Sequence, residues 1–214
     1  MALSKADFNN INVTPVASKK LKWNSAADGF ETGDLGGSMV LLSTLTASSS
    51  ATLDFTSGID STYKEYIFKF IDIHPATNEA YFSFQVDTGT NTNYNITVTS
   101  TAFDAYNYES GGSPALTYRT GNDQAQGTAF QRVTSSGGSD NDQSFAGTID
   151  LYNPSSTTFV KHFMCTSNTT SHDDSTANSN YAGYFNTTTA LTRVQFKMSS
   201  GNIDAGVVKM YGIL

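Results

Sequence analysis

Side chains able to act as nucleophiles or bases are few in this chain, and their spacing is not that of known catalytic groups. The single Cys165 follows Phe163 by two positions, so on a strand both face the same way, and we expect a buried, inert thiol. The histidines, His74, His162 and His172, are too far apart in sequence for a His-x-His or His-x-x-x-His metal pair. No Gly-x-Ser-x-Gly nucleophile elbow is present. The sequence therefore predicts no catalytic residue, no metal site and no cofactor.

Carboxylate chemistry is the next alternative. Glycoside hydrolysis needs two carboxylates in one cleft. The chain's glutamates are Glu31, Glu65, Glu79 and Glu109. They fall where solvated side chains are the rule, which favours no such pair. The acidic stretches 140–142 and 173–174 supply only part of the six to eight oxygens that Ca²⁺ requires, and we interpret them as solvated loops.

Tyrosines clustered among Asn and Asp are typical of sugar-contacting surfaces. Two such clusters occur, one with Tyr106 and Tyr108 and one with Tyr181 and Tyr184. Tyrosine is also common at sheet edges and subunit contacts. Glycan contact and structural use therefore both stay open for these four residues.

The polarity of the chain comes from neutral side chains more than from charges. Of 214 residues, 29 are Thr, 26 Ser and 17 Asn, whereas charged residues make up only 14%. Thr, Ser and Asn favour turns and solvent-facing strand positions over helix interiors. The net charge of −7 argues against nucleic acid or a membrane surface as a partner, because both attract clustered Lys and Arg. With no secretory signal and no long apolar run, we expect synthesis in a cytoplasm.

From about residue 38 onward, stretches in which apolar residues recur at every second position appear repeatedly, which indicates half-buried strands. The predicted strands are 39–46, 51–55, 66–73, 80–86, 94–98, 129–134, 147–152, 159–166, 191–198 and 207–213. The pattern predicts an all-β domain over residues 38–214, a two-sheet antiparallel β-sandwich of jelly-roll type.

Four finer expectations concern particular segments. Residues 66–73 are apolar at both parities, which predicts a strand covered on both faces. In the following strand, Ser83 and Gln85 are expected to face outward. We expect a short helix within 101–109 and a long polar loop over 167–180.

Residues 1–37 differ from the rest because their apolar side chains are scattered without a period among Asn, Gly and Pro. This pattern predicts an extended N-terminal arm that is too apolar to be a solvated tail. We expect the arm to lie on another surface, either of its own domain or of a neighbour. The residues expected to make these contacts are Phe8, Ile11, Val13, Trp23 and Phe30.

Three stretches carry a resemblance to a known group of proteins. The first is Phe8-Asn9-Asn10-Ile11-Asn12-Val13-Thr14-Pro15 through Asp28-Gly29-Phe30-Glu31. The second is Tyr63-Lys64-Glu65-Tyr66-Ile67-Phe68 followed by Ile73-His74-Pro75-Ala76-Thr77, and the third is Gly201-Asn202-Ile203-Asp204-Ala205-Gly206 through Tyr211-Gly212-Ile213. On these stretches the whole chain resembles small structural proteins of tailed marine phages, of the cyanophage type. No functional residue carries over from them.

The resemblance implies a non-enzymatic virion protein, made in the host cytoplasm and exposed on the particle as a tail or fibre component or as a capsid decoration. The implied partners are other virion proteins and copies of the chain itself, with a trimer expected by analogy with phage appendages. The alternative is a receptor- or carbohydrate-binding module at an appendage tip, which contacts a host surface glycan. A third hypothesis, a depolymerase, lacks a supporting carboxylate pair.

Overall fold

The computed structural model describes residues 14, 16, 19–26, 28–34, 38–112 and 114–214, which form strands and turns but no helix. The strands are β1 (Lys19–Trp23), β2 (Phe30–Asp34), β3 (Met39–Ser50), β4 (Leu53–Phe55), β5 (Glu65–Pro75), β6 (Phe82–Thr88), β7 (Val98–Tyr108), β8 (Ala115–Tyr118), β9 (Ala125–Gly127), β10 (Gln131–Arg132), β11 (Phe145–Tyr152), β12 (Lys161–Thr170), β13 (Ser175–Phe185), β14 (Leu191–Met198) and β15 (Ile203–Ile213). The pairings of β1 with β2 and of β4 to β15 with one another are antiparallel. The predicted all-β, antiparallel class is therefore confirmed.

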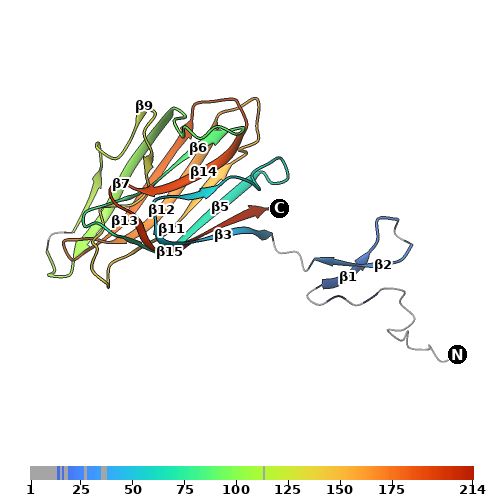
Figure 1. Cartoon of the computed structure of the whole chain (residues 1–214), viewed down its shortest axis with the longest axis horizontal. Coiled ribbons are helices and arrows are strands. Elements are labelled where there is room, and N and C mark those ends of the chain that lie inside the picture. Colours follow the sequence, from blue (N-terminus) through green and yellow to red (C-terminus); the bar gives the residue numbers. More distant parts are fainter. Residues whose placement is uncertain (1–13, 15, 17–18, 27, 35–37, 113) are drawn as a thin grey trace. The chain divides into compact units, whose positions relative to one another are not determined.

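Two compact units make up the chain, residues 1–40 and 41–214 (Figure 1). In the first, β1 and β2 form a hairpin in which Trp23 pairs with Phe30 and their rings stack 4.4 Å apart. Over residues 19–34 the structure thus has a hairpin where the sequence pattern predicted an extended segment. The strands are too short, at five residues each, for their alternation to stand out from the surrounding Asn and Gly. The arm residues Phe8, Ile11 and Val13 lie outside the described residues.

Two sheets face each other in the 41–214 unit. The larger has nine strands, in the order β3-β15-β5-β11-β12-β13-β7-β8 with β9 also paired to β7. The smaller has four, in the order β10-β6-β14-β4. The core lies between them and takes side chains from both. This arrangement is sandwich-like, as Figure 1 shows for β6 and β14 against the strands of the larger sheet.

Phe196 of β14 lies at the centre of the core. Its ring stacks on that of Phe82 in the neighbouring strand at 5.4 Å and meets Phe68 of the opposite sheet at 5.6 Å. Phe55 and Phe84 are each 6.1 Å away. Because buried aromatic rings contribute large apolar areas and favourable ring geometry, this five-ring cluster joins the two sheets.

Two of the segment expectations are wrong. Strand β7 covers most of residues 101–109, which were expected to be helical, and β12 and β13 leave only a short turn of the expected loop 167–180. The inward positions of β13 hold small residues, such as Ser175, Ala177 and Ser179, instead of large apolar ones. Without large side chains the alternation does not stand out as a strand pattern, although it is regular.

Strand β6 is more deeply buried than its alternation suggested. Its first six residues are all buried, including Ser83 and Gln85, which were expected to face outward. The Gln85 amide donates to the carbonyls of Ile96 and Ala129, both at 3.0 Å, so its burial does not leave it unpaired. Strand β5 is covered less than expected, because Ile71 remains exposed.

Replacing the central ring tests this account of the core. We expect Phe196→Ala to lower the free energy of unfolding by about 3–5 kcal/mol, because it leaves a cavity between two sheets that cannot both collapse into it. Phe159→Ala is the matched control, since Phe159 is 69% exposed, and should stay within about 0.5 kcal/mol of the wild type. Urea unfolding followed by tyrosine fluorescence measures both. Equal losses in the two variants would contradict the central role of Phe196.

Candidate functional site

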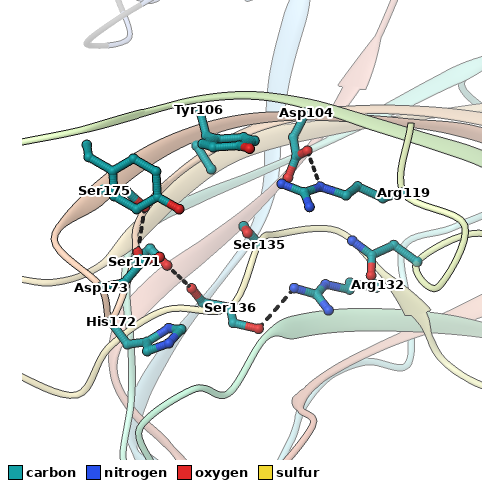
Figure 2. A pocket seen from close by; sticks show the side chains of 13 residues that line it. Asp104, Tyr106, Arg119, Arg132, Ser135, Ser136, Ser171, His172, Asp173 and Ser175 are labelled. Atoms are coloured by element: carbon teal, nitrogen blue, oxygen red, sulfur yellow. Dashed lines mark hydrogen bonds and ion pairs between the residues drawn. The ribbon is translucent and has the colours of Figure 1, made fainter. Parts of the chain in front are cut away.

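A polar cavity of about 330 Å³ lies beside β7 and β13 of the larger sheet, and Figure 2 shows the side chains that line it. Its walls come from the inward faces of β7 and β13, the turn after β8, the segment that follows β10 and the turn between β12 and β13. Most of the lining atoms are polar, in contrast to the aromatic core beside them. The cavity lies entirely within the 41–214 unit.

An ion pair forms one wall of the cavity. Arg119 Nε donates to Asp104 Oδ1 at 2.5 Å, and the side chains are 38% and 2% exposed, respectively. This hydrogen bond raises the pKa of Arg119 above its ordinary value. The guanidinium also lies over the ring of Tyr106, with Cζ 5.1 Å from the ring centroid. The charge of Arg119 is therefore met by a buried carboxylate and an aromatic face.

Arg132 contributes a second cation with a different environment. Its Nε donates to the carbonyl of Thr134 at 2.7 Å and its Nη2 to the hydroxyl of Ser136 at 3.1 Å. The guanidinium lies 4.3 Å from the ring centroid of Tyr81. No ion pair within the described part of the chain includes Arg132. Neutral groups thus hold the guanidinium of Arg132 in place without neutralising its positive charge.

The opposite side of the cavity carries an acidic group (Figure 2). Ser175 Oγ donates to Asp173 Oδ1 at 2.6 Å, and this hydrogen bond lowers the pKa of Asp173, so the carboxylate is ionised at neutral pH. Ser171 Oγ donates to the carbonyl of Ser136 at 2.7 Å and ties the two rims together. His172, which also lines the cavity, has its Nε2 3.7 Å from a carboxylate oxygen of Glu79.

The four tyrosines predicted to contact glycans fall into two groups. Tyr106 and Tyr108 both line the cavity, half-buried, with ring centroids 5.8 Å apart in an edge-on arrangement. Tyr181 is 3% exposed and donates its hydroxyl to the carbonyl of Thr134 at 3.0 Å; burial raises its pKa to about 12. Tyr184 lies three positions further along β13 and therefore points to the other face, beside His162. Only the first pair belongs to the cavity.

Asp104, Arg119 and Arg132 were not singled out from the sequence. The chain has only three arginines and these are two of them, but their scarcity gave no indication that they meet in one cavity. Arg119 comes from a region in which no strand was predicted, whereas Arg132 lies in the predicted strand 129–134. Arg119 follows β8 in the larger sheet and Arg132 ends β10 in the smaller one, so only the packing of the sheets brings them to one cavity.

Cys165 is buried, as its strand parity predicted. Burial raises the pKa of its thiol well above the ordinary value, and the sulfur lies 3.7 Å from the carbonyl of Val133. Among the described residues no group of three or more His, Cys, Asp or Glu side chains is arranged to hold a metal ion.

None of the protein-family models, curated proteins or solved structures compared with the chain matches it. No helix in the described ranges is long and apolar enough to cross a membrane. The assignment of a role therefore depends on the geometry of the two units.

Mutation of the two partners of the Arg119–Asp104 ion pair should lower the free energy of unfolding by different amounts. We expect Arg119→Met to destabilise the protein by about 2 kcal/mol, because it leaves the buried Asp104 carboxylate without its cation. The value is below that for fully buried pairs because Arg119 keeps contact with water. Asp104→Asn should cost less, and the double variant should recover part of the Arg119→Met loss. Urea unfolding of the four proteins measures the cycle, and a larger loss in Asp104→Asn would contradict the assigned burial.

The thiol should be unreactive in the folded protein. With its pKa raised and its sulfur buried, Cys165 should react with a disulfide reagent at pH 8 on the order of 100-fold more slowly than in guanidinium chloride. Thr166→Cys in a Cys165→Ser background is the matched control, because Thr166 is the exposed neighbour on the same strand. Rapid native labelling of Cys165 itself would show that the strand opens readily.

Proposed function

We propose that this chain is a non-enzymatic structural protein on the outside of a tailed-phage virion, attached through its N-terminal unit. One observation carries the proposal. The described part of that unit exposes large apolar side chains, and Trp23 is 62% exposed although it stacks on Phe30. Val16, Leu21 and Met39 are also exposed.

Physical reasons favour a partner for this surface. A lone two-stranded hairpin is marginally stable in water, because one pair of strands cannot bury an apolar face. Burial of apolar area contributes roughly 25 cal/mol per Å², so covering the Trp23–Phe30 pair is a favourable contact for an assembling protein. The proposed partner is another virion protein or a further copy of this chain.

The finer features of the proposal come from the sequence. The resemblance to small structural proteins of tailed phages supports a tail, fibre or decoration role, and the analogy with appendages supports a trimer. A jelly-roll connection of the strands and contact of the N-terminal unit with a neighbour belong to the same proposal. The low proportion of charged residues suits surfaces that pack beside copies of themselves.

A second candidate function is that of a carbohydrate-binding module. The observation that favours it is the polar cavity with Tyr106 and Tyr108 among arginine, aspartate and serine side chains (Figure 2). Aromatic rings and ionised side chains in one concave site are suited to a hydroxylated ligand. The two functions are compatible, because the exposed hairpin and the cavity lie in different units.

The attachment hypothesis is tested in assembled particles. We expect a Trp23→Ala, Phe30→Ala double variant to be at least about tenfold depleted from purified virions, since it removes the exposed apolar pair. Its 41–214 unit should keep the wild-type unfolding midpoint. Quantitative mass spectrometry of virions grown with each variant gives the copy number.

Phe159→Ala is the control, because it also removes an exposed aromatic ring but from the 41–214 unit. It should be incorporated normally. Normal incorporation of the double variant would contradict attachment through the hairpin, whereas absence of the wild-type chain from virions would contradict the virion role itself.

A further inference from the structure

We propose that the cavity binds a sugar that carries a carboxylate, with the carboxylate on Arg132, the hydroxyls on Asp173 and the cavity serines, and the ring against Tyr106 and Tyr108. This inference deepens the second candidate function and rests on it, but it does not depend on the virion role.

Arg132 is the group that selects an anion. A guanidinium has five N–H donors, and the two hydrogen bonds of Arg132 go to a carbonyl and a hydroxyl, which leave its charge in place. The same bonds and the Tyr81 ring hold its orientation. An oriented, uncompensated guanidinium at a cavity wall is suited to a planar carboxylate, which it can engage with two parallel hydrogen bonds.

Arg119 has a different role, because the carboxylate of Asp104 already neutralises its charge. Asp104 accepts its Nε–H, and the guanidinium lies on the Tyr106 ring. Buried Asp104 holds Arg119, and Arg119 in turn packs on the ring of Tyr106. These two contacts fix the position of the Tyr106 side chain in the cavity wall. A wall that is ordered before the ligand arrives reduces the entropy cost of binding.

Asp173 determines the orientation in which a ligand is expected to bind. It lies across the cavity from Arg132, as Figure 2 shows. Its carboxylate, held by Ser175, can accept hydrogen bonds from hydroxyl groups and repels an anion. The carboxylate of a ligand is therefore expected at the Arg132 side and its hydroxyls at the Asp173 side.

The charge of the lining side chains and the volume of the cavity restrict the class of ligand further. With the His172 imidazole neutral, the charges of the lining side chains, Arg119 and Arg132 against Asp104 and Asp173, sum to zero, which suits a singly charged carboxylate better than a doubly charged phosphate. The volume of about 330 Å³ is near the lower end of the roughly 300–1,000 Å³ range of small-molecule sites. A single acidic sugar residue, such as a hexuronic acid at a chain end, meets both conditions.

The test compares two sugars that differ only at the carboxylate. Methyl β-D-glucuronide and methyl β-D-glucoside are titrated into the full chain and followed by NMR or calorimetry. We expect the glucuronide to bind about tenfold or more tightly, the difference that one charge-assisted contact supplies. Arg132→Gln should remove this preference and leave the weaker binding of the glucoside unchanged.

Arg193→Gln is the matched control, because Arg193 is the third arginine and donates to the Gly89 carbonyl away from the cavity. It should keep the preference. Equal binding of the two sugars by the wild type, or a preference that survives Arg132→Gln, would overturn the inference and leave a neutral-sugar module in place. Failure of both sugars to bind at millimolar concentration would overturn the inference together with the carbohydrate-binding function. Inorganic phosphate is titrated as a further probe, and tighter binding of phosphate than of the glucuronide would overturn the carboxylate assignment.

Discussion

The nine-stranded sheet is wider than the four-stranded sheet that packs on it, and this mismatch decides where apolar side chains can be buried. Strand β10, at the edge of the smaller sheet, contains only two residues. Where the sheets overlap, inward positions are apolar, as at Phe163 in β12 and Val98 in β7. Further along the same strands, inward positions become Ser167 and Asp104, which need hydrogen-bond partners. The polar cavity is therefore a consequence of the unequal sheets and not an interruption of the core.

The segment 133–136 covers part of the uncovered face and does so through its backbone. Its carbonyls accept hydrogen bonds from the hydroxyls of Ser167, Tyr181 and Ser171, at 2.6, 3.0 and 2.7 Å. These bonds satisfy both the buried hydroxyls and three backbone carbonyls of an irregular segment. Because the segment is fixed in this way, Arg132 at its start is held at the cavity wall. The same polar contacts thus stabilise the fold and position the candidate binding group.

The sequence predicted those strands whose inward residues are large. Segments 66–73 and 191–198 were recognised at close to their observed bounds, because large apolar residues occupy both parities of the first, and Val, Phe and Met alternate with polar residues in the second. Segment 101–109 was not, since Ala and Asp at inward positions give little hydrophobic contrast. The tyrosines of the site could be found from local composition. Arg119 and Arg132 could not, because their meeting depends on which strands lie at the edges of two different sheets, and local periodicity carries no information on sheet order.

The proposed attachment and the proposed sugar binding would reinforce each other physically. A small, polar cavity that engages one sugar residue gains little apolar burial, so each site by itself is expected to bind weakly. Several copies held on one particle convert later binding events into intramolecular ones, and the resulting avidity can exceed the single-site affinity by about 10²–10⁴. This gain requires that the copies be attached without covering the cavity. The chain has its exposed apolar pair, Trp23 and Phe30, in one compact unit and its polar cavity in another, so the two proposed contacts have no side chain in common.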